Sequence, residues 1–233
     1  MKLGIIGAME IEVSTLKGKL ADRLDETLCG MEFCSGNLCG TPVVIVQCGV
    51  GKVNAAICTQ ILCDRYQVDR IINTGVAGSL CNELDIGDLV VAKDVVHHDM
   101  DVTALGYSVG QVPGLSVFAF AADENLIAKS YDAAEQENPG HTKIGRIASG
   151  DQFVAGREKK DKIIADTGAI CTEMEGAAIA HTAWRNQIPI AVIRAISDKA
   201  DDSAEMDYPT FEAIAAERCA NVVMTLAEMM NNE

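Results

Sequence analysis

Residues 169–198 read AICTEMEGAAIAHTAWRNQIPIAVIRAISD, and this stretch decides the class of the fold. An apolar run over 169–172 is followed by a helical run of small residues over 176–185, and a second apolar run covers 190–196. A strand, a helix and a strand in this order are typical of a sheet whose parallel strands are joined by crossover helices. The stretch therefore predicts an α/β fold.

The rest of the chain repeats the alternation of strand and helix. Strands are predicted over 3–8, 31–35, 43–48, 70–73, 89–96 and 143–148. Helices are predicted over 10–20, 52–66, 123–136, 157–166 and 210–230, with an irregular stretch over 97–115. No linker-like segment divides the chain, so we predict one domain over residues 1–233, with helices flanking a mixed, mostly parallel central β-sheet in three α/β/α layers.

The composition excludes several kinds of partner. The 233 residues carry a formal charge of −15 and a sequence pI near 4.6. Nucleic-acid backbones and anionic membrane surfaces bind clusters of Lys and Arg, so neither is an expected partner. The apolar run at the amino terminus covers only residues 3–9, which is too short for a signal peptide or a membrane span. We therefore predict a cytoplasmic protein with no membrane or nucleic-acid partner.

Two groups of residues resemble metal ligands in type but not in spacing. The nine cysteines include no Cys-x-x-Cys pair, and the even spacing of Cys29, Cys34 and Cys39 does not fit a zinc site. The cysteines are predicted to be reduced and to pack as small apolar residues. The His-His-Asp sequence at 97–99 lies in an extended stretch, where adjacent side chains point apart. No metal is predicted.

Carboxyl groups follow two of the strands predicted in residues 169–198. Glu175 opens a helix of small residues, and Asp198 follows the strand over 190–196. The crevice of an open α/β sheet lies beyond the carboxyl ends of its strands, so both side chains are expected to point into one cleft. An acid at the exit of a buried strand costs desolvation energy, which indicates a chemical role. Glu173 is explained by a favourable interaction with the helix dipole.

Three glycine-containing loops follow strands, at residues 4–7, 49–51 and 75–78. Glycines there allow backbone N–H groups to approach a ligand. The second loop resembles the end of a P-loop, but Val46 and Val53 occupy positions where that motif needs Gly and Ser or Thr. The first loop lacks the Gly-x-Gly of dinucleotide-binding proteins. No cofactor is therefore predicted.

Six short motifs occur in order along the chain. They are GAMEIE (7–12), GVGKVNA (49–55), NTGVAG (73–78), SGDQFV (149–154), EME (173–175) and RAISD (194–198). Together they resemble the 5′-methylthioadenosine/S-adenosylhomocysteine nucleosidases of the nucleoside phosphorylase superfamily, over residues 3–229. The resemblance implies a nucleoside phosphorylase-like fold and a hydrolase that releases adenine from these nucleosides, and from 5′-deoxyadenosine, in methionine salvage and S-adenosylmethionine by-product recycling.

The resemblance also implies a role for each carboxyl group. Cleavage of an N-glycosidic bond passes through a ribosyl cation, so the leaving base needs a proton and the sugar needs negative charge nearby. Asp198 matches the acid that protonates adenine N7, and Glu12 matches the base that deprotonates the attacking water. Glu175 matches the residue that accepts hydrogen bonds from the ribose hydroxyls. Arg194 would fix the water and the carboxylates, and Ser197 would hold Asp198.

Other matched positions surround the base, the sugar and the 5′ group. Phe153 would stack on the purine, and the backbone of Val154 would pair with the adenine edge. The remaining matches are Met174 at the sugar, the run Val76, Ala77 and Gly78 along the substrate, and Met9, Val50 and Tyr208 around the apolar 5′ thioether. Tyr208 stands where family members often have Phe, and Val76 stands where some have Ser.

The irregular stretch over 97–113 matches a segment that reaches into the site of a partner subunit. Its matched residues are Val102, Leu105, Tyr107 and Pro113, and Leu105 replaces a frequent Phe. The resemblance thus implies a homodimer with shared active sites that acts on a small nucleoside substrate.

Other functions stay open from the sequence alone. A purine nucleoside phosphorylase has the same fold, but phosphate needs positive groups, and the loops over 4–12 and 75–79 contain no Arg. A hydrolase of 6-amino-6-deoxyfutalosine shares these motifs. A nucleoside sensor is disfavoured by the complete set of carboxyl groups, and a dinucleotide oxidoreductase is disfavoured by the missing glycine fingerprint.

Overall fold

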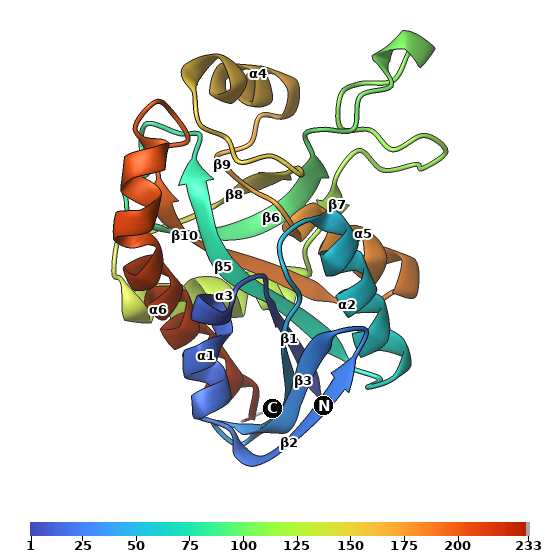
Figure 1. The fold of residues 1–233 in the computed structure, drawn as a ribbon, viewed down its shortest axis with the longest axis vertical. Coiled ribbons are helices and arrows are strands. Elements are labelled where there is room, and N and C mark those ends of the chain that lie inside the picture. Colours follow the sequence, from blue (N-terminus) through green and yellow to red (C-terminus); the bar gives the residue numbers. More distant parts are fainter. Residues whose placement is uncertain (232–233) are drawn as a thin grey trace.

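The computed structural model describes residues 1–231, which form one continuous β-sheet with helices around it (Figure 1). The strands are β1 (Leu3–Gly7), β2 (Ala21–Leu28), β3 (Met31–Leu38), β4 (Thr41–Gln47), β5 (Arg70–Ser79), β6 (Leu89–His97), β7 (Phe120–Ala121), β8 (Thr142–Ser149), β9 (Cys171–Glu173) and β10 (Ile190–Asp198). The helices are α1 (Glu10–Gly18), α2 (Lys52–Asp64), α3 (Glu124–Glu137), α4 (Arg157–Thr167), α5 (Gly176–Asn186), α6 (Ala204–Asn231) and the short 3-10 helix η1 (Thr103–Leu105). Residues 232–233, the end of the predicted domain, lie outside the described residues.

Each predicted strand and helix has a counterpart in the structure, but three features differ from the prediction. β2 was not predicted, because its sequence ADRLDETL is charged and exposed at most positions, as an edge strand allows. The two-residue strand β7 is too short to give a pattern. α6 begins at Ala204 rather than at residue 210, with Pro209 inside its second turn. A proline near a helix start removes few backbone hydrogen bonds, so the helix continues through it.

The sheet closes on itself at one end. Its strand order is β10-β6-β8-β9-β5-β1-β4-β3-β2, and β10 pairs with β5 as well as with β6. Within residues 1–231, five strand pairs are parallel and five are antiparallel. The sheet is therefore mixed, as predicted, although the parallel pairs do not outnumber the antiparallel ones. The antiparallel pairs are the two hairpin pairs of β2, β3 and β4, the short β5–β9 and β6–β10 contacts that close the sheet, and the pair of β6 with the two-residue β7.

Helices cover both faces of the sheet, which confirms the three α/β/α layers (Figure 1). α1, α3 and α6 pack together on one face, and α2 packs against α5 on the other. Successive side chains of a strand point to opposite faces, so Ile5 of β1 belongs to the apolar cluster that includes Leu16 of α1, and Ile6 belongs to the cluster that includes Leu62 of α2. Among residues 1–231, none of the helices has the length and hydropathy that a membrane crossing requires.

The strand ends bring distant residues to one place. β10 runs parallel to β5, and Asp198 at the end of β10 is paired with Gly78 of β5. β1 runs parallel to β5 on the other side, so the loop after Gly7 emerges at the same edge. The carboxyl ends of these three strands therefore form one rim, as expected for an α/β sheet.

The stretch from 98 to 119 contains no strand and only the short helix η1, as predicted (Figure 1). It extends away from the sheet (Figure 1), and Leu105, the last residue of η1, is 73% exposed.

The cysteines are all free, and they do not share one environment. Cys29 and Cys39 are exposed in turns at the two ends of β3, whereas Cys34 is buried within that strand. The prediction of buried cysteines is therefore wrong for Cys29 and Cys39. A strand rises about 3.3 Å per residue, so these three thiols cannot bind one ion.

Candidate active site

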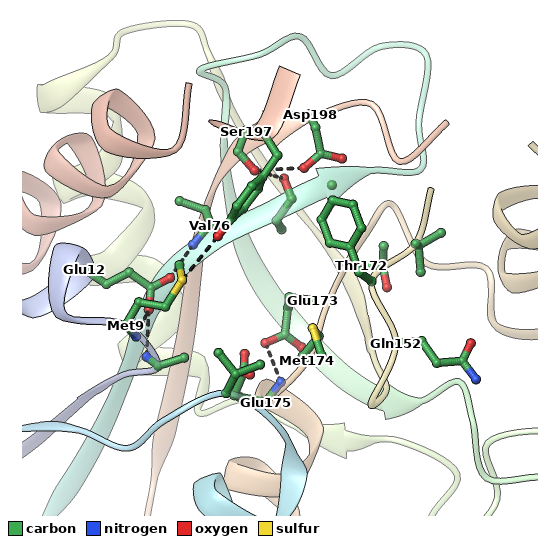
Figure 2. A pocket seen from close by; sticks show the side chains of 17 residues that line it. Met9, Glu12, Val76, Gln152, Thr172, Glu173, Met174, Glu175, Ser197 and Asp198 are labelled. Atoms are coloured by element: carbon green, nitrogen blue, oxygen red, sulfur yellow. Dashed lines mark hydrogen bonds between the residues drawn. The ribbon is translucent and has the colours of Figure 1, made fainter. Parts of the chain in front are cut away.

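A pocket opens at the rim formed by β1, β5 and β10 (Figure 2). The space between its walls is about 620 Å³, including the part that is open to solvent. Its lining comprises Ala8, Met9, Glu12, Val50, Val76, Ala77, Gly78, Gln152, Phe153, Val154, Thr172, Glu173, Met174, Glu175, Ser197, Asp198 and Tyr208. Every catalytic and substrate-binding residue predicted for this chain's own pocket lines it except Arg194, which is buried nearby.

Glu12 is held by the start of α1 and by β5. Its side chain is 4% exposed, and Oε2 accepts hydrogen bonds from the N–H groups of Ala8 at 2.7 Å and Met9 at 3.0 Å. Oε1 accepts a third hydrogen bond from the N–H of Val76 at 3.1 Å. Burial raises the pKa of Glu12, while the charge of Arg194 and the three N–H groups oppose the shift. The carboxyl group is thus fixed in one orientation at the pocket wall.

Asp198 is the carboxyl group at the end of β10. It is 2% exposed, Oδ2 accepts a hydrogen bond from the Ser197 hydroxyl at 3.0 Å, and Oδ1 accepts one from the N–H of Ala200 at 2.8 Å. Burial raises the pKa of Asp198 despite these two hydrogen bonds, and the charges of Asp207 and Asp201 raise it further. A carboxyl group in this environment keeps its proton to higher pH, which suits a general acid.

Glu175 lies at the start of α5 and faces the start of α2. It is 7% exposed, and Oε1 accepts a hydrogen bond from the N–H of Gly51 at 2.7 Å. Burial and the charge of Glu173 raise the pKa of Glu175 to about 8. The loop over 49–51, one of the three glycine-containing loops, therefore holds a protein carboxyl group.

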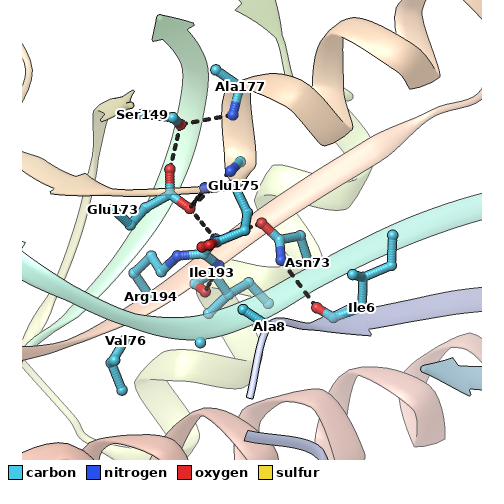
Figure 3. Close-up of polar contacts among 12 residues, drawn as sticks. Ile6, Ala8, Asn73, Val76, Ser149, Glu173, Glu175, Ala177, Ile193 and Arg194 are labelled. Carbon is cyan, nitrogen blue, oxygen red and sulfur yellow. Dashed lines mark hydrogen bonds and ion pairs between the residues drawn. The ribbon is translucent and has the colours of Figure 1, made fainter. Parts of the chain in front are cut away.

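Beneath the pocket, Glu173 and Arg194 form a buried ion pair (Figure 3). Arg194 Nη2 lies 2.5 Å from Glu173 Oε2 and also donates to Asn73 Oδ1 at 2.5 Å. The N–H groups of Glu175 and Gly176 donate to Glu173 Oε2 at 3.1 and 2.8 Å. Burial would raise the pKa of Glu173, but the charge of Arg194 and these hydrogen bonds hold it below its usual value.

Glu173 therefore does more than interact with a helix dipole, the reading favoured by the sequence. It accepts hydrogen bonds from N–H groups at the start of α5 as expected. It also neutralises the charge of Arg194, and it lines the pocket. Burial lowers the pKa of Arg194, but the carboxylates of Glu173 and Glu12 outweigh this and keep it above its usual value. The sequence signal that could have identified Glu173 is the arginine within the apolar strand 190–196, because a buried arginine requires a buried acid.

The apolar side of the pocket joins three separate segments. The ring of Phe153, which is 46% exposed, meets the ring of Tyr208 edge to face with centroids 5.6 Å apart. The hydroxyl of Tyr208 donates to Met9 Sδ at 3.2 Å. Val50 is 49% exposed at the opening. α6, the loop after β1 and the loop after β8 are thereby brought together.

Ala8, Gln152 and Thr172 also line the pocket, and the sequence-based prediction did not include them. Ala8 and Gln152 lie within quoted motifs, so their neighbours were the available signal. Thr172 precedes the EME motif in a strand of only three residues, and no sequence pattern indicated which way its side chain points.

The four residues predicted to reach a partner do not line the chain's own pocket. Val102, Leu105, Tyr107 and Pro113 all belong to the extended stretch over 98–119. The assignment of these residues to a partner's pocket stays a prediction.

One cluster of potential metal ligands is found within residues 1–231, at Asp25, Glu32 and Cys34 on the β2–β3 hairpin. Arg23 donates to Asp25 at 2.7 Å and to Glu32 at 3.3 Å, and Lys17 also donates to Glu32. The positive charges of Arg23 and Lys17 therefore already compensate the negative charges of Asp25 and Glu32. The cluster lies on β2 and β3, apart from the strands that form the pocket rim.

The pocket separates two kinds of carboxyl group. Figure 2 shows Asp198 on one side of the pocket and Glu12 on the other, with Glu175 at a third position. Burial raises the pKa of both groups, but at Glu12 three N–H donors and the charge of Arg194 oppose the rise, whereas at Asp198 the charges of Asp207 and Asp201 add to it and suit the group to donating a proton. The arrangement can protonate a leaving group at one end of a ligand and stabilise positive charge at the other.

Comparison with known proteins agrees with this geometry. The model of the phosphorylase superfamily matches residues 2–228. A 5′-methylthioadenosine/S-adenosylhomocysteine nucleosidase of Staphylococcus aureus is 42% identical over 229 residues, covering 98% of this chain and 100% of the relative. The structure of such a nucleosidase from S. pneumoniae with the transition-state inhibitor MT-ImmA aligns with a TM-score of 0.93 at 36% identity, covering 99% of this chain and 100% of that one.

A futalosine hydrolase of Helicobacter pylori also aligns with a TM-score of 0.93, at 32% identity and with 98% of both chains covered. The extent of these matches over nearly the whole chain confirms the predicted fold and resemblance. The chain belongs to the phosphorylase superfamily and, within it, to the family of 5′-methylthioadenosine/S-adenosylhomocysteine nucleosidases.

Proposed function

We propose that this protein hydrolyses the N-glycosidic bond of 5′-methylthioadenosine and S-adenosylhomocysteine, releasing adenine and the 5′-substituted ribose. The observation that carries the proposal is the convergence of three buried carboxyl groups, Asp198, Glu12 and Glu175, on one pocket. The names of the full-length relatives support the choice of substrate. We include 5′-deoxyadenosine as a substrate, because the same apolar surface can accommodate a 5′ methyl group.

Asp198 is the general acid in this proposal. Its proton moves to N7 of adenine while the bond between C1′ and N9 breaks, and the electron pair of that bond goes to the base. Neutral adenine leaves, and a ribosyl cation is left behind. The raised pKa of Asp198, caused first by burial, supports this role.

Glu12 is the general base. A water molecule attacks C1′ and forms the new C–O bond, and Glu12 takes the proton that the water loses. The three N–H groups that hold Glu12 favour its ionised form and fix its position. Its negative charge also stabilises the ribosyl cation. Burial raises the pKa of Glu12, and Arg194, 2% exposed and paired with Glu173, contributes a positive charge that opposes this rise.

The remaining residues hold the substrate. Glu175 hydrogen-bonds the ribose hydroxyls, Met174 packs on the sugar, and Val76 to Gly78 border it. Phe153 stacks on adenine and the backbone of Val154 pairs with its edge. The apolar groups of Met9, Val50 and Tyr208 surround the 5′ thioether. The position of all of these residues on the pocket lining supports the assignments.

Water, rather than phosphate, is the nucleophile in this proposal. The pocket lining contains no Lys, Arg or His within residues 1–231, and the nearby Arg194 is engaged by Glu173. Phosphate binding needs such cations. Adenine release from 5′-methylthioadenosine, followed by ultraviolet absorbance with and without phosphate, tests this point. We expect equal rates, and a strict requirement for phosphate would make the protein a phosphorylase.

A second candidate substrate is 6-amino-6-deoxyfutalosine. The structural similarity to a futalosine hydrolase favours it, because the two folds align over 98% of both chains. The ratio of kcat/KM values for this compound and for 5′-methylthioadenosine decides between a single and a dual role. We expect the methylthio compound to have the higher value, given the apolar Met9, Val50 and Tyr208 at the 5′ side.

The proposal extends to assembly and physiological role. The exposed Leu105, with Val102, Tyr107 and Pro113 on the same extended stretch, would complete the pocket of a second subunit in a cytoplasmic homodimer. Methionine salvage and removal of S-adenosylmethionine by-products are the corresponding pathways. Sedimentation at equilibrium tests the dimer, and a monomer with full activity would contradict shared pockets.

A further inference from the structure

Thr172 is a buried polar residue of the pocket that the proposed mechanism does not use. It lies at the middle of β9 and is 5% exposed. Its hydroxyl oxygen is buried and has no hydrogen-bond partner among the described residues, although the residue lines the pocket. Buried hydroxyl groups nearly always have partners, because an unpaired one loses its hydrogen bond to water without replacement. The hydroxyl of Thr172 is therefore suited to a partner that enters the pocket.

The strand pairing places Thr172 beside the proposed acid. Thr172 is paired with Gly78 across the β5–β9 ladder, and Asp198 is paired with the same glycine across the β5–β10 ladder. Directly paired residues project from the same face of a sheet, so the hydroxyl and the carboxyl group stand on either side of Gly78. Figure 2 shows both on the side of the pocket away from Glu12 and Met9.

Gly78 lies between these two side chains and has no side chain of its own. A Cβ atom at this position would lie 2.7 Å from Asp198 Oδ1 and 2.9 Å from the Cβ of Ala200, so no larger residue fits without displacing them. The absent side chain lets Asp198 and Ala200 pack directly against Gly78. The half-exposed ring of Phe153 lines the same pocket and offers an aromatic surface to a base.

We infer that Thr172 is a specificity-determining residue that recognises the nucleobase through its hydroxyl group. The inference rests on the proposed function, which places adenine N7 at Asp198. On the edge of adenine that carries N7, the neighbouring polar group is the 6-amino donor. The Thr172 hydroxyl accepts a hydrogen bond from this amino group, and the base thereby gains a contact that purine without a 6-amino group cannot make.

Binding of free bases to the full-length protein tests the inference without relying on turnover. Calorimetric titration gives the dissociation constants of adenine and of unsubstituted purine for the wild type and for Thr172→Val, which keeps the shape of the side chain and removes the hydroxyl. We expect adenine affinity to fall about tenfold while purine affinity changes less than about twofold. Thr172→Ser, which keeps the hydroxyl, should retain adenine affinity within about threefold.

Ser130→Ala is a matched control. Ser130 is another fully buried hydroxyl with no partner among the described residues, but it lies on α3 and does not line the pocket. Its removal should leave the affinity for both bases unchanged. Equal losses of adenine and purine affinity in Thr172→Val, or no loss of either, would overturn the inference.

The proposed function and the role of Thr172 can fail separately. Adenine binding that depends on the Thr172 hydroxyl, in a protein that does not cleave 5′-methylthioadenosine, would support the role of Thr172 and refute the proposed function. Normal cleavage with no selective loss in Thr172→Val would refute the role of Thr172 alone.

Discussion

Gly75 of β5 lies directly against the carboxyl group of Glu12, so that a Cβ atom on Gly75 would come within 2.9 Å of Glu12 Cδ and closer still to Oε1. The N–H of the next residue, Val76, donates to the same Oε1 at 3.1 Å. The strand can therefore hold the Glu12 carboxyl group only because residue 75 has no side chain. The position of the proposed base depends on a glycine that does not itself line the pocket.

Gly75→Ala should reduce activity by displacing Glu12. A shift of about 1 Å in a catalytic group costs about a hundredfold in rate, so we expect kcat to fall by at least that factor. The measurement is steady-state hydrolysis of 5′-methylthioadenosine, with circular dichroism to show that the variant is folded. A folded variant with wild-type kcat would contradict the tight fit between residue 75 and Glu12.

Glu173→Gln should destabilise the protein. Arg194 is 2% exposed and would be left without its carboxylate partner, and removal of one member of a buried ion pair typically costs about 3–5 kcal/mol. The check is the free energy of unfolding from urea denaturation. Lys162→Gln serves as the control, because its salt bridge with Asp166 is solvent-exposed and its loss should cost less than about 1 kcal/mol. Similar losses of unfolding free energy in both variants would show that the buried ion pair stabilises the fold no more than the exposed one.

Val76→Ser should leave activity nearly unchanged. Val76 lines the pocket, but its backbone N–H, which the substitution retains, makes the contact with Glu12. We therefore expect Glu12 and Arg194 to suffice for positioning the water, and kcat/KM to change less than about threefold. A rise of about a hundredfold, roughly 2.7 kcal/mol in transition-state free energy, would show that the water needs a hydroxyl at this position.

The pH dependence of kcat/KM should have a falling alkaline limb. Burial raises the pKa of Asp198, so the acid stays protonated above its ordinary range and loses its proton as the pH rises through the shifted value. Activity falls with the protonated fraction. With a substrate whose leaving group needs no proton, such as a nitrophenyl riboside, this limb should disappear. Its persistence with such a substrate would assign the limb to another group, for which Glu175, with a pKa of about 8, is the candidate.

The order of strands and helices was enough to predict the layered fold and the position of Asp198 at the end of a strand, whereas most of the pocket residues were predicted from the resemblance of the six motifs to a known family. The closure of the sheet was not predictable, because the contact of β10 with β6 joins strands about a hundred residues apart and leaves no local pattern. The charged edge strand β2 lacks the alternation that identifies a strand.

Within the site, the positions of Glu173 and Thr172 on the pocket wall could not be predicted from the sequence. Glu173 looks like any acid at a helix start until Arg194 is seen to be buried against it. Thr172 is one polar residue in a short apolar strand, and only its pairing with Gly78 reveals that it faces the pocket. In both cases the decisive partner is distant in the sequence.

The most direct test of the central claim, that Asp198 protonates the departing base, is the activity of Asp198→Asn on two substrates with the same ribose and different leaving groups. With 5′-methylthioadenosine, kcat should fall between about a hundredfold and ten-thousandfold, because the amide keeps the shape of the side chain but cannot supply the proton. With the 5-methylthio nitrophenyl riboside, whose leaving group needs no proton, kcat should stay within about tenfold of wild type. Equal losses on both substrates would contradict the assignment of Asp198 as the acid.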